Sequence, residues 1–362
     1  MDRDALGFFE TSLHRIADRV VLCEKPSAKV KKKVTAQVSK VVERFLSPFF
    51  APRLERFAFG EAQFAYRKKH GARDAVMYYV LSWVGALNVG SKIGVYCSDV
   101  QGAFDKVDAD LLMCKLSSFN LDACLLAVIR SWLRDRSGFV IVSGQKSRAM
   151  RLRNMVFQGT VWGPTLWNAF FGDCAFVIRA CGFDFVVYAD DCNAFKFYAR
   201  SLSNGAIEDD LRECQRSLHR WGAANSVVFD AGKEETMIIS NVDPSGGPAK
   251  LLGIEFDNRL LMNMAVHKCA RKASWKTKSL LRSRRFYNTV DVVMLYKSHV
   301  VSYIEYRTPG IHFASSSVLR ELDDIQRRYV RQLDLTEESA FMNFNLAPLE
   351  VRRDIEIGRA HV

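Results

Sequence analysis

Three aspartates stand at positions where they could support metal-dependent phosphoryl chemistry. Asp190 and Asp191 are adjacent, with the largely apolar run 183–187 before them and the alternating run 193–198 after them. This order is typical of a strand, a tight turn and a second strand, so both carboxylates are expected at a hairpin tip. Two like charges this close oppose each other's ionisation unless a cation compensates them. For the pair alone, a solvated turn is the alternative, because aspartate is common in turns.

The third aspartate strengthens the case for a metal site. Asp99 follows the short apolar strand predicted over 93–98 and precedes a helical run over 106–134. A carboxylate at a strand end beside a hairpin-borne pair can hold two cations, roughly 3.5–4 Å apart, which clamp the attacking and leaving oxygens of an in-line displacement. Carboxylate oxygens suit Mg²⁺. The predicted cofactor is therefore two Mg²⁺ ions, with Mn²⁺ as an alternative, held by Asp99, Asp190 and Asp191.

Three motifs in one order resemble the palm motifs of reverse transcriptases from non-LTR (LINE-type) retrotransposons. They are Asp99-Val-Gln-Gly-Ala-Phe-Asp105, Gln158-Gly-Thr-Val-Trp-Gly-Pro164 and Tyr188-Ala-Asp-Asp191. The resemblance covers roughly residues 35–355. It implies an RNA-directed DNA polymerase, part of a retrotransposon polyprotein, that extends a primer 3′-hydroxyl with dNTPs. The implied partners are an RNA template, a DNA primer and dNTPs, and no membrane is expected.

The resemblance places three basic residues near phosphates. Arg67 and Lys68 lie in a segment similar to the fingers motif that closes over the nucleotide, and they are expected on its triphosphate. Lys233 falls where the family carries a lysine near the departing pyrophosphate. The alternative for each is an exposed basic turn.

The resemblance also places three residues near the sugar and the base pair. Phe104 is expected beneath the incoming sugar, where its ring would take the volume of a 2′-hydroxyl; the alternative is a core residue at the start of a helix. Gln158 and Gly159 are expected beside the base pair, because an amide side chain offers donors and an acceptor and glycine permits close backbone approach.

Charge favours a polyanionic partner. The chain carries 52 Lys and Arg against 40 Asp and Glu, a net charge of +12. Residues 266–288 contain no acidic side chain, and their basic residues recur at helical spacing. We expect the following members of this stretch to bind nucleic acid: Lys268, Arg271, Lys272, Lys276, Lys278, Arg282 and Arg285.

The expected fold class is α+β: a right-hand polymerase fold with an antiparallel palm sheet, a fingers extension and a helical thumb. The expected boundaries are an N-terminal segment with a basic linker over 1–34, fingers over 35–92, palm over 93–256 and thumb over 257–356. Residues 357–362 resemble a translated sequencing adapter, so a non-native tail is expected there. A helix beginning near Thr35 is expected to end at Pro48 and Pro52.

Composition agrees with an intracellular globular protein. Hydrophobic residues make up 49% and charged residues 25%, and the nine cysteines show neither a disulfide framework nor zinc-type spacing. Neither a signal peptide nor a membrane-spanning run is visible, so the expected location is the nucleus and cytoplasm. Two alternatives remain open: a catalytically inactive nucleic-acid-binding remnant, and a group II intron-type maturase with the same palm.

Overall fold

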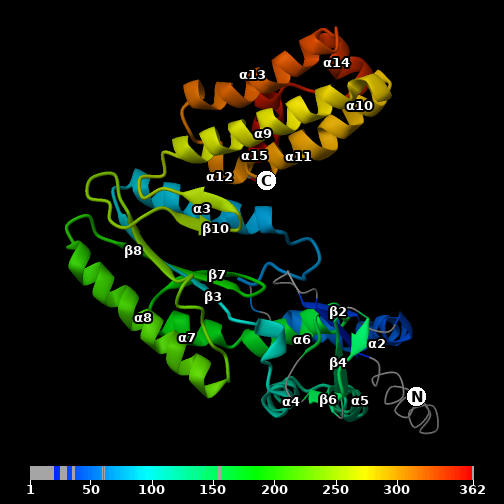
Figure 1. Ribbon diagram of the computed structural model, residues 1–362. Coiled ribbons are helices and arrows are strands. Elements are labelled where there is room, and N and C mark those ends of the chain that lie inside the picture. The colour runs from blue at the N-terminus through cyan, green and yellow to red at the C-terminus, as the bar shows by residue number, and fades with distance from the viewer. Residues whose placement is uncertain are drawn as a thin grey trace. The chain divides into compact units, whose positions relative to one another are not determined.

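The computed structural model describes residues 20–24, 31–34, 37–58, 60, 62–134, 136–142, 144–152 and 156–360 (Figure 1). Its elements are helices and mostly antiparallel strands, which confirms the predicted α+β class. Two compact units share the chain. The first comprises Met1–His70, Tyr96–Phe195 and Asp210–Glu234, and the second comprises Gly71–Val95, Lys196–Asp209 and Glu235–Val362.

A four-stranded sheet carries the three aspartates. Its strand order is β7 (Asp184–Tyr188), β8 (Asp191–Tyr198), β3 (Lys92–Asp99) and β9 (Glu235–Ile239). The predicted hairpin is confirmed, because β7 and β8 are antiparallel and Tyr188 lies opposite Asp191. Every residue of β3 before Asp99 is buried, as expected for a strand with neighbours on both sides.

A second sheet has the order β2 (Lys31–Val34), β1 (Val20–Glu24), β4 (Arg136–Val142) and β5 (Gln145–Lys146), and β6 (Met150–Leu152) also pairs with β4. The pairing of β1 with β4 is parallel, and the other pairings in this sheet are antiparallel. Strands β4 and β6 thus pair from either side of residue 144.

The helical run expected over 106–134 is two helices, each with its own aspartate cap. Asp108 accepts hydrogen bonds from two backbone N–H groups at the start of α4 (Ala109–Ser118), and Asp122 does the same at α5 (Ala123–Leu133). Side-chain acceptors at this position satisfy donors that have no partner within the helix. Further helices in this part of the chain are η1 (Ala103–Asp105), α6 (Gly163–Phe171), α7 (Cys174–Ala180) and α8 (Asn204–Ala224).

The prediction that Pro48 and Pro52 end the first long helix is wrong. The helix α2 runs from Gln37 to Phe57 with both prolines inside it. Proline removes one backbone donor and crowds the preceding turn, at a cost of about 3 kcal/mol. Burial of Leu46, Phe50 and Leu54 on one face of α2 offsets that cost through tertiary packing.

The second unit contains α3 (Ala72–Asn88), the hairpin β10 (Ala249–Leu251) and β11 (Ile254–Phe256), and the C-terminal helices. The hairpin turn lies at Leu252 and Gly253, whose φ angles are 47° and 80°. Two consecutive positive φ angles match the twist of a two-residue hairpin turn, and glycine adopts such angles without steric cost.

The C-terminal helices lie beside one another, with α13 along α9 (Figure 1). The basic stretch expected as one helix is α9 (Asn263–Ser283) followed by the short η2 (Arg284–Phe286). The remaining elements are α10 (Thr289–Tyr296), the π-helix η3 (Lys297–Val301), α11 (Ser302–Glu305), α12 (Thr308–Ile311), α13 (Ser316–Gln332), α14 (Glu337–Phe344) and α15 (Leu349–Ala360). Within the described ranges, no helix has the length and apolarity that a membrane span requires.

Candidate active site

The turn that carries the paired aspartates is fixed by hydrogen bonds from two other segments. Ala189 has a φ of 61°, a left-handed conformation that is strained for a residue with a Cβ. Its carbonyl oxygen accepts a 2.8 Å hydrogen bond from Trp167 Nε1 on α6, and its N–H donates to Gln63 Oε1 at 3.3 Å. The turn conformation is therefore determined by its surroundings, as is common at functional sites.

The three aspartates share one electrostatic environment. Burial raises the pKa of Asp191 to about 6, and the charges of Asp190 and Asp99 contribute to the rise. Burial also raises the pKa of Asp190, with Asp99 adding to the rise, while the Lys233 ammonium group opposes it. Burial is thus the largest cause of both raised pKa values, and the neighbouring carboxylates add to it.

The donor chemistry of this site fits a hard divalent cation. Carboxylate oxygens are the ligands that Mg²⁺ prefers, and the mutual repulsion of these aspartates is what a bound cation would relieve. In the part of the chain that the structure describes, no group of three or more His, Cys, Asp or Glu side chains is already arranged around a metal position.

Lys233 lies against Asp99 rather than away from it. Its ammonium group donates a hydrogen bond to Asp99 Oδ2 and lies 3.7 Å from Asp230 Oδ2. The hydrogen bond to Asp99 and the charge of that carboxylate raise the pKa of Lys233. The side chain remains 62% exposed, so it can leave Asp99 without a large loss of buried surface.

A buried carboxylate beside Lys233 was not predicted from sequence. Glu234 Oε1 accepts hydrogen bonds from Tyr96 Oη at 2.7 Å and from His219 Nε2 at 2.6 Å, and Gln215 Nε2 donates to its other oxygen at 2.7 Å. Gln215 and His219 are four residues apart on α8, a spacing that puts them on one helix face. That spacing was the signal available in the sequence. Through Glu234, the strand that ends at Asp99 is joined to the loop that carries Lys233.

Phe104 contacts two other aromatic rings. Its ring stacks on Trp167, with centroids 5.8 Å apart, and meets the Tyr66 ring edge-on at 6.3 Å. Its backbone oxygen accepts a 2.9 Å hydrogen bond from Val156 N–H. Phe104 is half-buried, so part of its ring remains available to a ligand.

Gln158 and Gly159 lie in an exposed turn before α6. Gly159 has a φ of 89°, which a residue with a Cβ rarely adopts. The end of this turn is held by Glu43, a fully buried carboxylate on α2 that sequence reasoning also missed. Its Oε2 accepts from Val161 N–H at 2.6 Å and from Trp162 N–H at 3.2 Å.

Glu43 is a satisfied buried acid and not a catalytic one. Its Oε1 accepts from Ser39 Oγ at 2.8 Å and from Trp132 Nε1 at 3.3 Å, and its backbone oxygen accepts from Trp162 Nε1 at 2.7 Å. Buried carboxylates persist when several donors surround them in this way. The role of Glu43 is therefore to position the turn before α6.

Arg67 is turned toward its own segment. Its guanidinium donates to the backbone oxygens of Gly60 at 2.8 Å and Gln63 at 3.0 Å, and it lies 3.6 Å from Glu55. Its side chain is only 15% exposed, whereas Lys68 is exposed. In this conformation Arg67 braces the segment, and Lys68 is the more accessible of the two cations.

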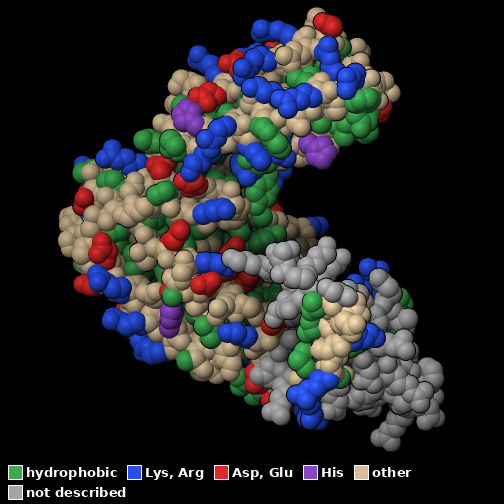
Figure 2. Space-filling view, viewed as in Figure 1, with side chains coloured by type: hydrophobic (Ala, Val, Ile, Leu, Met, Phe, Trp, Pro, Cys, Tyr) green, Lys and Arg blue, Asp and Glu red, His purple; other side chains and the backbone are tan. Residues whose placement is uncertain are grey.

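The predicted nucleic-acid-binding residues mark a basic face on α9 and its extension, part of the Lys and Arg surface over the C-terminal helices in Figure 2. The exposed members are Lys268, Arg271, Lys272, Lys278, Arg282 and Arg285. Lys268 forms an ion pair with Glu255 at 2.5 Å, and the half-buried Lys276 donates to the His299 backbone oxygen at 3.0 Å. Lys268 and Lys276 therefore already form polar contacts within the protein.

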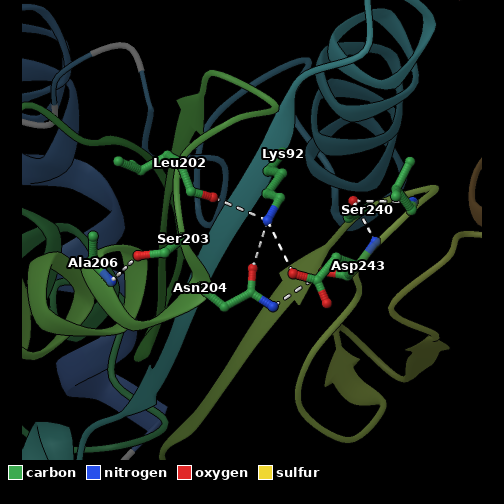
Figure 3. Close-up of polar contacts among 8 residues, drawn as sticks. Lys92, Leu202, Ser203, Asn204, Ala206, Ser240 and Asp243 are labelled. Carbon is green, nitrogen blue, oxygen red and sulfur yellow. Dashed lines mark hydrogen bonds and ion pairs between the residues drawn. The ribbon is translucent and has the colours of Figure 1, made fainter.

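The start of strand β3 is anchored by a buried lysine (Figure 3). Lys92 Nζ donates to the Leu202 backbone oxygen at 3.0 Å, to Asn204 Oδ1 at 2.9 Å and to Asp243 Oδ2 at 3.2 Å. These acceptors use all three ammonium protons. The anchored strand ends seven residues later at Asp99.

Comparison with known proteins identifies the family of the chain. A model of the family described as reverse transcriptase (RNA-dependent DNA polymerase) matches residues 24–256. The RNA-directed DNA polymerase from mobile element jockey of Drosophila funebris is 25% identical over 294 residues, which are 75% of this chain and 31% of that protein. The probable RNA-directed DNA polymerase from transposon BS of Drosophila melanogaster is 28% identical over 232 residues, 61% of this chain and 25% of that protein.

The fold is also found among solved structures. A telomerase from Candida albicans, solved with a fragment of telomeric RNA, superposes with a TM-score of 0.52 at 11% identity, covering 93% of this chain and 67% of that one. This likeness concerns the fold alone. The chain spans about a third of the length of the curated relatives it matches. With its palm-type motifs in order and more than half of its length matched, the chain belongs to the reverse transcriptase family.

Proposed function

We propose that this chain is the polymerase part of a non-LTR retrotransposon protein and that it extends a primer 3′-hydroxyl with dNTPs on an RNA template. The observation that carries the proposal is the electrostatic coupling of Asp99, Asp190 and Asp191 at a strand end and a hairpin tip. Homology to the jockey and BS polymerases supports the same reaction. The chain covers only 31% of the jockey protein's length, which supports the proposal that it is one region of a longer polyprotein.

In the proposed reaction, the primer hydroxyl attacks the α-phosphorus and pyrophosphate leaves. Asp99, Asp190 and Asp191 would hold two divalent cations, whose chemistry is to neutralise the attacking and leaving oxygens. Lys233 moves from Asp99 to the departing phosphate, where its ammonium group offers a proton and a positive charge. The raised carboxyl pKa values favour cation binding as the way to stabilise ionised aspartates here.

The substrate is held by the segments around the carboxylates. Phe104 presents part of its ring to the sugar and leaves a 2′-hydroxyl without space or a hydrogen-bond partner. Gln158 and Gly159 approach the base pair from an exposed turn. Lys68 meets the triphosphate, and Arg67 joins it only after leaving the backbone oxygens that it now contacts.

The template and primer are the proposed partners of the basic face on α9. Exposed cations at helical spacing follow a phosphate backbone without reading its sequence. Lys272 lies over the exposed ring of Trp275, with its ammonium group 4.4 Å from the centroid, so this face also presents an aromatic surface. These features support binding to a template-primer duplex.

One observation favours a second candidate, a nucleic-acid-binding protein without polymerase activity. The ammonium group of Lys233 donates a hydrogen bond to Asp99, one of the proposed metal ligands. An inactive remnant would keep this ion pair permanently. The two candidates differ in whether added Mg²⁺ produces primer extension.

Primer extension on a poly(rA) template with an oligo(dT) primer tests the proposal. The parent chain should extend the primer in Mg²⁺, and Asp190→Ala should abolish extension. Asp184→Ala is the matched control, because Asp184 is an exposed aspartate at the start of the same hairpin and should be dispensable. Duplex binding without extension by the folded parent chain would instead support the inactive remnant.

A further inference from the structure

Tyr66 stands close to the proposed nucleotide site but has no role in the proposed reaction. Its segment is joined to the strand that leads to the paired aspartates: Phe64 N–H donates to the Val187 oxygen at 2.9 Å, and Val187 N–H donates to the Ala62 oxygen at 2.9 Å. The segment therefore behaves as a short additional strand along β7. It brings Tyr66 near the hairpin tip.

One side chain fixes both this segment and the turn that carries Asp190. Gln63 is buried, and its Oε1 accepts from Ala65 N–H at 2.9 Å and from Ala189 N–H at 3.3 Å. Arg67 holds the same segment from its other side by donating to the Gly60 and Gln63 oxygens. The pairing with β7 and the two hydrogen bonds of Gln63 thus leave little freedom to the neighbouring Tyr66.

Tyr66 itself is held in a strained conformation. Its φ is 60°, which is uncommon for a residue with a bulky side chain and costs of the order of 1 kcal/mol. The side chain is nevertheless 51% exposed, so burial of the ring does not account for the strain. This conformation places the Tyr66 ring edge-to-face against Phe104. The two ring centroids are 6.3 Å apart, and the angle between the ring planes is 82°.

Phe104 thus meets one aromatic ring from the Tyr66 segment and another from α6. Trp167 stacks on it at 5.8 Å and is tied through Nε1 to Ala189, in the turn that carries Asp190. Edge-to-face and stacked contacts restrict different motions of a ring. Without the Tyr66 ring, the half-buried Phe104 would lose its edge-to-face contact and keep the stacked one.

We propose that Tyr66 is a positioning residue for sugar selection: its ring fixes Phe104 in the orientation that excludes a ribose 2′-hydroxyl. The inference rests on the proposed polymerase function. Because the contact is made by the ring, phenylalanine at position 66 should serve and smaller or non-aromatic side chains should not. Tyr66 would thereby influence which nucleotide is accepted while leaving the carboxylates and the reaction itself unchanged.

Single-nucleotide incorporation by the whole chain in Mg²⁺ tests this inference. The quantity to compare is the ratio of kcat/KM for an rNTP to that for the matching dNTP. Tyr66→Ala and Tyr66→Leu should each raise the ratio about two- to tenfold, the range that an aromatic pair contributes. Tyr66→Phe should restore the parental ratio, and kcat for the dNTP should change little in all three. Phe176→Ala, which removes a 74% exposed ring from α7, is the matched control and should leave the ratio unchanged.

A double variant shows whether Tyr66 acts through Phe104. Phe104→Ala alone should raise the ratio, and adding Tyr66→Ala should change it no further, because there is no ring left to position. Full additivity, or a parental ratio in both Tyr66→Ala and Tyr66→Leu, would overturn the inference while leaving the proposed function intact. A folded parent chain that extends no primer would overturn the proposed function and this inference together.

Discussion

Tyr96 Oη donates a 2.7 Å hydrogen bond to Glu234 Oε1, joining the strand that ends at Asp99 to the residue that follows Lys233. Burial, and then the hydrogen bond to Glu234, raises the pKa of Tyr96, so the phenol stays protonated and remains a donor. Two residues of the proposed chemistry are thereby fixed in mutual position by two residues that take no part in it.

Loss of the Glu234 carboxylate should destabilise the fold and misplace Lys233. Glu234→Ala leaves the donors of Tyr96, Gln215 and His219 without their acceptor, and a buried group left unsatisfied costs about 1–3 kcal/mol. Urea denaturation should show a lower free energy of unfolding by about that amount. Glu235→Ala changes the exposed neighbour, whose carboxylate accepts one exposed 3.3 Å hydrogen bond from Lys250 N–H, and should cost less than Glu234→Ala. An equal decrease in the free energy of unfolding in both variants would contradict a stabilising role for the hydrogen bonds of Glu234.

Glu43 should be among the most sensitive positions of the first unit. Its carboxylate accepts from two backbone N–H groups before α6 and from two side chains, so Glu43→Ala removes four hydrogen bonds at once. Each buried donor that is left without an acceptor costs about 1–3 kcal/mol. Arg44→Ala, at the exposed next position, is the control. An unchanged melting temperature in Glu43→Ala would show that the turn before α6 does not depend on the hydrogen bonds of Glu43.

Local patterns in the sequence were sufficient for the elements that carry the aspartates. The alternation around Asp190 predicted the hairpin, and the apolar run before Asp99 predicted β3, because side-chain periodicity follows from backbone geometry alone. These predictions needed no information about distant residues.

The supporting residues could not be predicted in the same way. Tyr96 and Glu234 are 138 positions apart, and Glu43 lies 118 positions from Val161, so their pairing exists only in the folded chain. The continuation of α2 through Pro48 has a similar cause, since tertiary packing offset a local penalty. Local propensity is a weak guide where packing decides.

Asp191 should make the metal-free protein less stable as the pH rises from about 4 to about 6. Its pKa is raised to about 6 in the folded state, against about 4 when unfolded, so the folded state binds more protons in this window and stability falls with increasing pH. Asp191→Asn removes that effect. In EDTA, the melting temperature of the variant minus that of the parent should therefore grow between pH 4 and pH 6.

The same pair of proteins offers a check with metal. Added Mg²⁺ at pH 7 should raise the melting temperature of the parent more than that of Asp191→Asn, because the variant lacks one carboxylate for the cation. A melting-temperature difference in EDTA that is independent of pH would show that Asp191 titrates normally.

Salt dependence should identify the cations of α9 that bind phosphates. Lys268 and Lys276 are committed to Glu255 and to the His299 oxygen, so the larger contribution is expected from Arg271, Lys278 and Arg282. Changing these three to Ala should flatten the log–log slope of duplex binding. The expected change is about 0.9 for each phosphate that is no longer neutralised in B-form DNA, and of a similar order for a hybrid.

The control for that triple variant comes from α8. Arg212, Arg216 and Arg220 are exposed arginines on a helix, and the last two pair with Glu213. Their replacement by Ala removes the same formal charge and should leave the slope unchanged. If both triple variants flatten the slope equally, the binding reflects overall charge and not the basic face of α9.

Lys233 should affect the chemical step more than nucleotide binding. In the free protein its ammonium group neutralises Asp99, and in the proposed reaction it meets the leaving pyrophosphate. Lys233→Ala should therefore lower kcat for dNTP incorporation by about 10- to 100-fold, within the range of general acid catalysis, with a smaller change in KM. Lys233→Arg keeps the positive charge but is a far weaker acid, so it should recover KM and only part of kcat. Loss confined to KM, with kcat intact in Lys233→Ala, would assign Lys233 to binding the triphosphate instead.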